Sequence, residues 1–128
     1  MPIVSRSLVA VAVSSLVFTL LPVKSFGATA VQNVAYVQRL ISRGDGNFGN
    51  CMAQVSRVPA GLNCVGSGSQ GFVTFDCSGD FDSKASGESR FSMAQLALVT
   101  GNKVQIYATD DNKHNGYCYA FDFRVRND

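Results

Sequence analysis

The hydrophobic period changes within residues 91–107, which read FSMAQLALVTGNKVQIY. In the first half, apolar side chains recur at helical spacing. Gly101 follows where a helix commonly ends in the left-handed conformation. The second half alternates between apolar and polar residues, as in a half-buried strand. The segment therefore predicts a helix over residues 88–100 and a strand over residues 103–109.

Strand patterns lie on both sides of this segment. Upstream, three stretches rich in β-branched and aromatic residues are separated by Gly, Pro and Asn turn signals: residues 31–43, 50–58 and 71–77. Downstream, residues 117–126 form a last strand after a polar hairpin loop that closes on an Asn-Gly pair. Its expected apolar face holds Tyr117, Tyr119, Phe121, Phe123 and Val125.

The predicted order is β-β-β-α-β-β. Five short strands with one helix between strands 3 and 4 are typical of a mostly-β, OB-fold-like five-stranded antiparallel barrel. Such a barrel has no exposed sheet edge, and the helix covers one of its ends. A small α+β sandwich of another topology is the alternative.

Residues 1–30 have the composition of a cleavable signal peptide. Arg6 precedes a 14-residue apolar run, and small residues follow as far as Ala30. The run is shorter than the roughly 20 residues of a membrane span, which argues against an uncleaved anchor. We expect cleavage after Ala30, or else after Gly27, and a single exported domain over residues 31–128, in the periplasm or secreted.

Removal of the leader changes the charge of the chain. Arg6 and Lys24 leave with it, so nine basic residues balance the nine acidic ones. A neutral domain lacks the positive field that phosphate binding requires, and nucleic acid is therefore not an expected partner. No later apolar run is long enough to span a membrane.

Four cysteines remain after the leader: Cys51, Cys64, Cys77 and Cys118. Their spacings lack the closely spaced ligand pairs of a structural zinc site. In a short exported chain they indicate a disulfide framework, for which the sequence alone leaves three pairings open. Two disulfides also compensate for a small core.

Candidates for catalysis are few. The only histidine, His114, lies in the polar hairpin loop, where a solvated turn residue is expected. The acid pairs Asp80–Asp82 and Asp110–Asp111 resemble turn caps, and no EF-hand pattern is present. Two G-x-G-x-x-G matches precede strands rather than helices, so they do not predict a dinucleotide site. We predict no catalytic residue, no metal site and no cofactor; a small hydrolase using His114 is the least favoured alternative.

Tyr107 is the best candidate for a ligand contact. It lies on the strand face opposite Val104 and Ile106, so its ring is expected to be half exposed. An aromatic ring with a hydroxyl group suits sugar faces and protein interfaces. Tyr119, by contrast, is expected in the core.

Residues 91–107 resemble the helix, Thr-Gly turn and strand of AB5 toxin B subunits, in the subtilase cytotoxin and pertussis-like group. The stretch 51–64, a cysteine pair around a hairpin, is similar to the same group. The hairpin over residues 111–118 resembles small uncharacterised exported bacterial proteins. The toxin resemblance implies an OB-fold, a possible ring of five with helices at its centre, and sialylated glycans as ligands. It also implies a Cys51–Cys64 disulfide, which leaves Cys77–Cys118.

The sequence and the resemblance together predict an exported, non-enzymatic binding subunit that recognises a host glycan or a partner protein. A stand-alone periplasmic or secreted domain with a structural or inhibitory role is the alternative.

Overall fold

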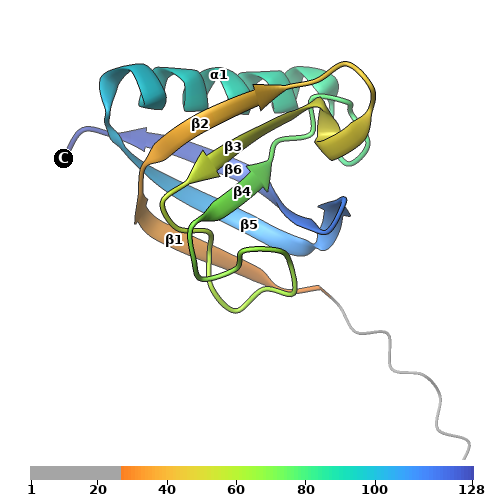
Figure 1. Cartoon of the computed structure of the whole chain (residues 1–128), viewed down its shortest axis with the longest axis horizontal. Helices are drawn as coiled ribbons and strands as arrows, with labels where there is room; N and C mark the ends of the chain where they lie inside the picture. The colour runs from red at the N-terminus through yellow and green to blue at the C-terminus, as the bar shows by residue number, and fades with distance from the viewer. Residues whose placement is uncertain (1–26) are drawn as a thin grey trace, which may run out of the picture.

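The computed structural model describes residues 27–128, so most of the expected leader lies outside the described residues. The elements follow one another as β1 (Thr29–Ala35), β2 (Val37–Ser42), a short 3-10 turn (Asn47–Asn50), β3 (Cys51–Val55), β4 (Gly71–Thr74), α1 (Lys84–Thr100), β5 (Lys103–His114) and β6 (Tyr117–Arg126) (Figure 1). Over residues 27–128 the protein is mostly β with one α-helix, as predicted. No helix within residues 27–128 has the length and apolar character to cross a membrane.

The six strands form one mixed sheet in the order β1-β5-β6-β4-β3-β2. The predicted five-stranded antiparallel barrel is not confirmed in that form, for two reasons. β4 pairs with β6 in parallel. The first predicted strand is also interrupted at Tyr36, whose backbone bonds to Ser56 through the serine hydroxyl and the serine N–H. β1 then pairs with β5, and β2 pairs with β3.

Helix α1 begins four residues earlier than predicted. Ser83 is its N-cap, and the Ser83 hydroxyl accepts a hydrogen bond from the backbone N–H of Ser86 at 3.1 Å. The predicted end is confirmed, because Gly101 has a φ of 71° and its N–H bonds to the carbonyl of Ala97. The helix lies across the strands in Figure 1 and turns Ala94 and Ala97 towards the core.

A β-bulge in β6 changes part of the predicted apolar face of that strand. Tyr107 of β5 pairs with Asp122, but the next residue, Ala108, pairs with Ala120, which leaves Phe121 as the extra residue. The inward positions therefore change from the even-numbered residues before the bulge to the odd-numbered residues after it. Ala120 is fully buried, and Phe121, predicted to face the core, is 38% exposed.

The disulfides also differ from the pairing that the toxin resemblance implied. Cys51 is bonded to Cys77 and Cys64 to Cys118, with Cα–Cα distances of 5.6 Å and 5.3 Å. The expected Cys51–Cys64 and Cys77–Cys118 bonds are wrong, because strand pairing brings other partners together. The N–H of Phe75 bonds to the carbonyl of Cys51, and an isolated bridge joins Val65 to Tyr117. All four cysteines are paired, which points to an oxidising, exported environment.

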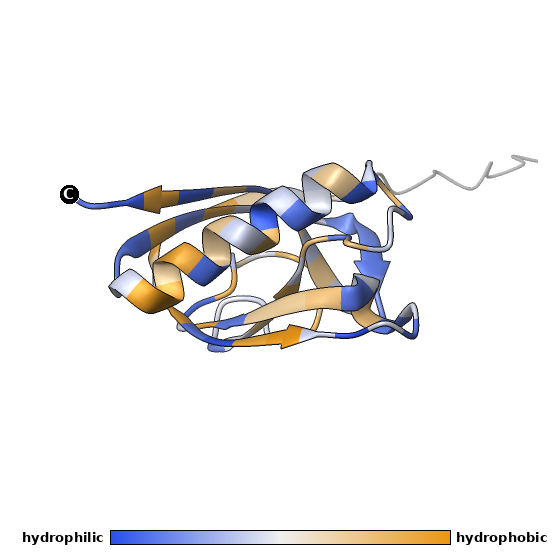
Figure 2. Ribbon diagram, turned by 90° about the horizontal axis from the view of Figure 1, so that it is seen from above, coloured by the Kyte–Doolittle hydropathy of each residue, from blue (hydrophilic) through white to orange (hydrophobic). Residues whose placement is uncertain are grey.

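Apolar residues also remain on the outside of α1. Figure 2 shows hydrophobic colour on the helix towards the end that leads into β5. Its exposed apolar side chains are Met93, Leu96, Leu98 and Val99, and the last of these is 85% exposed. We call these four residues the helix patch.

Candidate functional site

The only histidine is buried, against the prediction of a solvated turn residue. β5 continues through the expected hairpin loop as far as His114, whose side chain is 6% exposed. Only Asn115 and Gly116 form the turn before β6. The sequence pattern placed the Asn-Gly turn correctly but did not show that the polar residues before it belong to a strand.

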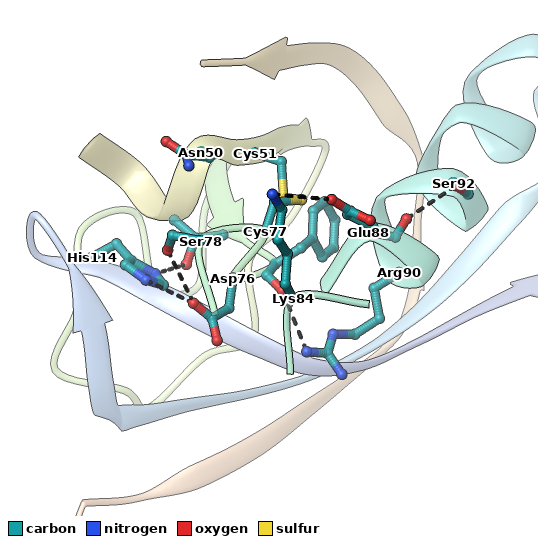
Figure 3. The surroundings of a disulfide bond; sticks show 12 residues. Asn50, Cys51, Asp76, Cys77, Ser78, Lys84, Glu88, Arg90, Ser92 and His114 are labelled. Atoms are coloured by element: carbon teal, nitrogen blue, oxygen red, sulfur yellow. Dashed lines mark hydrogen bonds and ion pairs between the residues drawn. A yellow bond between two sulfur atoms is a disulfide. The ribbon is translucent and has the colours of Figure 1, made fainter. Parts of the chain in front are cut away.

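The imidazole of His114 is faced by polar groups from the end of β4 and from the loop that follows it. Its Nδ1 lies 2.9 Å from the hydroxyl oxygen of Thr74, at the end of β4. Its Nε2 lies 3.3 Å from Asp76 Oδ1 and 3.3 Å from Asp80 Oδ2, as Figure 3 shows for the first of these carboxylates. Although it is buried, Nε2 makes no hydrogen bond of acceptable geometry within residues 27–128.

Asp76 is held by the backbone of the loop that follows it. This residue has a φ of 66° and no exposed surface, and the chain turns around its carboxylate. Oδ1 accepts the N–H of Asp80, and Oδ2 accepts the N–H groups of Phe81 and Asp82, each at 2.8 Å. Burial raises the pKa of Asp76, but these three hydrogen bonds and the neighbouring His114 hold it below its ordinary value.

Two neighbours fix the plane of the imidazole ring. The ring centroid of Phe81 lies 4.2 Å from that of His114. Gly49 lies on another side with a φ of 64°, where a Cβ atom would stand 2.7 Å from the Cε1 of His114. Glycine at this position therefore permits both the backbone conformation and the close approach of the ring.

Beyond Phe81 the cluster continues through Tyr119 and Arg90. Tyr119 is buried, as predicted, and its ring lies 5.3 Å from the ring of Phe81. Arg90 of α1 donates to the Tyr119 hydroxyl at 2.6 Å and to the carbonyls of Phe75 and Phe121. Burial raises the pKa of Tyr119. This arrangement anchors α1 on the sheet.

The connectivity from Thr74 to His114 to Asp76 resembles that of a nucleophile, base and acid in a hydrolase. A nucleophile must, however, meet its substrate, and Thr74 has no exposed surface. Its hydroxyl is also turned towards the carbonyl of Cys118. The geometry therefore does not favour acyl transfer at this site, and it is better suited to holding a small ion or to structural support.

A second region of interest lies on the outer face of β5 and β6. Tyr107 is half-buried, as predicted, and its ring lies 6.4 Å from the ring of Phe121. The guanidinium of Arg124 stands 4.8 Å from the Tyr107 ring centroid and bonds to Asp122. We call Tyr107, Phe121 and Arg124 the aromatic patch.

The aromatic patch borders a shallow hollow of about 220 Å³. Thr29, Ala30 and Val31 of β1 form its other wall. The acid pair Asp110–Asp111 lies near this end of the molecule and bonds to the backbone N–H groups of Ala28 and Gly27, so it caps the start of the domain. In the other predicted acid pair, Asp82 accepts the backbone N–H of Ser83, whereas Asp80 accepts the Ser78 hydroxyl and faces His114.

Sequence reasoning missed the convergence of His114, Asp76 and Asp80. Asp76 and Asp80 share the loop after β4, whereas His114 ends β5, and the parallel pairing of β4 with β6 brings the two segments together. No local spacing in the sequence signals it. No protein-family model, curated protein or solved structure matches the chain, so functional conclusions rest on this geometry.

Proposed function

We propose that the protein is an exported, non-enzymatic binding domain of the toxin B-subunit type, which recognises a glycan through the aromatic patch. The observation that carries this proposal is an accessible tyrosine–phenylalanine pair beside a hollow of about 220 Å³. The most elaborate polar cluster, around His114, is closed to a substrate, whereas the aromatic patch is open to one.

The chemistry of the aromatic patch suits a sugar. The apolar face of a pyranose ring packs on aromatic rings, and the tyrosine hydroxyl offers a hydrogen bond at the edge of the contact. Arg124 uses its Nε and Nη2 for Asp122. Its Nη1 hydrogens make no hydrogen bond within residues 27–128, and they suit the carboxylate of an acidic sugar. A sialylated glycan is therefore the ligand class that we favour.

The strand order supports an OB-like barrel as part of the same proposal. β1 and β2 lie at opposite edges of the sheet but are separated in the chain only by Tyr36. A chain that passes directly from one sheet edge to the other brings the two edges towards each other, which suits a partly open barrel of the OB type. The helix patch in turn supports self-association, because exposed apolar side chains that gather on one helix suit an interface with another chain.

A glycan array tests the proposal directly. The mature, oxidised protein is labelled and applied to matched sialylated and unsialylated glycans. We expect binding to sialylated members, weakened by at least about tenfold in Tyr107→Ala, because an aromatic contact residue at an interface contributes more than about 1.4 kcal/mol. Tyr36→Ala is the matched control, since Tyr36 is 44% exposed but lies outside the aromatic patch.

A blank array for a correctly folded protein would contradict the proposal. Light scattering of the same sample measures its assembly, for which a ring of five is the expected state. A strictly monomeric protein without glycan binding would favour the alternative, a stand-alone structural or inhibitory domain in the periplasm or outside the cell.

A further inference from the structure

We infer that His114, Asp76 and Asp80 form a binding site for one divalent transition-metal ion of the zinc class. This inference is independent of glycan recognition, because the aromatic patch contributes none of the three residues. The metal would fasten the 76–82 loop, which precedes α1, to the end of β5.

The three side chains have the spacing of a metal site. Their candidate ligand atoms, one from each residue, all lie within 4.8 Å of one another. The Nε2 of His114 is 3.3 Å from each of the two carboxylate oxygens. In a tetrahedral zinc site with bonds of roughly 2.0–2.1 Å, neighbouring ligand atoms stand about 3.3 Å apart. A small inward movement would therefore complete three corners of a tetrahedron.

The state of the imidazole nitrogen is the second, independent observation. Nε2 belongs to a side chain that is 94% buried, faces the two carboxylates and has no hydrogen-bond partner within residues 27–128. Buried polar atoms of this kind normally have a partner. A divalent ion between Nε2 and the carboxylates would satisfy the nitrogen and neutralise two negative charges.

The groups on the Nδ1 side of His114 resemble those that usually support a metal-bound histidine. Ligating imidazoles commonly donate the other ring N–H to an oxygen, which fixes the tautomer and the ring plane. Here Nδ1 faces the Thr74 hydroxyl at 2.9 Å, and that hydroxyl faces the carbonyl of Cys118. When Nδ1–H donates to the Thr74 hydroxyl and that hydroxyl donates to the Cys118 carbonyl, Nε2 carries no hydrogen. Its lone pair then points at Asp76 and Asp80.

An ion has a route to the site from the Asp80 side. The Asp80 side chain is 53% exposed, whereas those of His114 and Asp76 are buried. Ser78 lies against the same carboxylate, 2.7 Å from Asp80 Oδ2. A water molecule on this exposed side is the expected fourth ligand. One imidazole and two carboxylates suit Zn²⁺, whereas Ca²⁺ prefers six or more oxygen ligands.

The test uses Zn²⁺ and the mature, oxidised protein after dialysis against a chelator. Calorimetry measures the stoichiometry, and nitrogen-15 NMR of the imidazole follows the ion. Because the chain has one histidine, its imidazole signals belong to the site without ambiguity. We expect one Zn²⁺ per chain and a large shift of the Nε2 resonance, with little response of that resonance to Ca²⁺.

Asp80→Asn is the decisive variant, because its exposed side chain can change without removing the buried part of the cluster. We expect Zn²⁺ affinity to fall by about 100-fold in Asp80→Asn. Asp82→Asn is the matched control from the same loop: its side chain is 48% exposed, and its carboxylate faces Arg90 rather than His114. That variant should bind Zn²⁺ as the unchanged protein does.

Three results would overturn the inference. The first is no Zn²⁺ binding to the folded protein. The second is binding that leaves the imidazole resonances unmoved, which would locate the ion elsewhere. The third is equal affinity in Asp80→Asn and Asp82→Asn. Circular dichroism of each variant confirms that the comparison is between folded proteins.

Discussion

Strand β5 carries two regions that differ in access rather than in composition. At Tyr107 the strand presents an aromatic ring to the surface, beside a hollow and an exposed phenylalanine. At His114 the same strand presents an aromatic ring to the interior, among carboxylates and a hydroxyl. The residues with the richest chemistry are thus closed to substrates, and the open residues have little titratable chemistry. This contrast is the reason why we propose recognition rather than catalysis.

Irregular pairing between β5 and β6 changes what surrounds each of the two rings. The register shifts once after Tyr107, and it shifts again between Thr109 and Lys113. The first shift turns Phe121 outwards beside Tyr107, and after the second His114 points inwards. By parity along β5, Tyr107 and His114 already lie on opposite faces, because His114 shares the parity of the buried Ala108 and Ile106. The two register shifts therefore decide the neighbours of each ring rather than its face.

The largest difference in stability is expected between variants of the two tyrosines, Tyr119 beside the His114 cluster and Tyr107 in the aromatic patch. Tyr119→Ala should lower the free energy of unfolding by about 3–5 kcal/mol, because it empties a buried site and leaves Arg90 without its hydroxyl partner. Tyr107→Ala should lower it by only about 1 kcal/mol, since that ring is half-buried. Urea unfolding of both variants measures the difference. Equal losses would mean that the aromatic patch is part of the core.

The phenylalanine variants sharpen this comparison. Tyr119→Phe keeps the ring but leaves a buried donor of Arg90 unpaired, which should destabilise the protein by about 1–2 kcal/mol. Tyr107→Phe removes a hydroxyl that has no partner among residues 27–128, and it should change stability little.

Displacing the His114 ring should lower the free energy of unfolding by less than Tyr119→Ala does. Gly49→Ala introduces a Cβ atom 2.7 Å from the imidazole and strains a backbone with a φ of 64°. The backbone strain alone should lower stability by about 1–3 kcal/mol. Gly44→Ala is the control, because Gly44 has an open surrounding and no positive φ. Thermal unfolding compares them, and similar midpoints for the two variants would show that the ring is not confined.

Acid should destabilise the cluster around His114 before it affects the aromatic patch. The pKa of Asp76 is below its ordinary value in the folded protein, so its contribution is complete above about pH 4 and is lost as the pH falls through the lowered value. We expect the stability difference between the unchanged protein and Asp76→Asn to shrink from pH 6 to pH 3 in urea titrations. A difference that is constant with pH would contradict this assignment.

The sequence predicted the parts of the fold that depend on local patterns. Gly101 ends α1 as expected, Tyr117 begins the last strand, and the half-burial of Tyr107 follows from alternation in β5. Tyr119 is buried as predicted, but because Phe81 and Arg90 cover it rather than because of alternation. The mostly-β class with one helix follows from the same patterns.

The rest depends on contacts between distant segments, which alternation does not encode. The bulge at Phe121 is visible only when β6 is paired with β5. The bridge between Val65 and Tyr117 brings Cys64 to Cys118, and the bond from the Phe75 N–H to the Cys51 carbonyl brings Cys77 to Cys51. The position of Asp76 follows from its backbone loop. A resemblance based on cysteine spacing therefore predicted the wrong pairing, although the four residues were correctly identified as disulfide cysteines.

The smallest change in stability is expected at the start of the domain, beside the aromatic patch. The N–H of Ala28 lies 2.6 Å from Asp110 Oδ1, and the N–H groups of Asn63 and Ala28 lower the pKa of that carboxyl. Cleavage after Gly27 would place the new ammonium group at this carboxylate, which strengthens the contact. Cleavage after Ala30 would remove the first two residues of β1 and their pairing with Thr109 and Ala108.

We therefore expect Ala28 as the mature N-terminus, which mass spectrometry of the exported protein measures. Asp110→Asn should lower its melting temperature slightly, because the ammonium group then loses a charged partner. The same substitution should have less effect in a protein that begins at Val31, since that chain has no Ala28 to bind. A mature N-terminus at Val31 would show instead that β1 forms without these residues, and the hollow beside Tyr107 would then lose the wall made by Thr29 and Ala30.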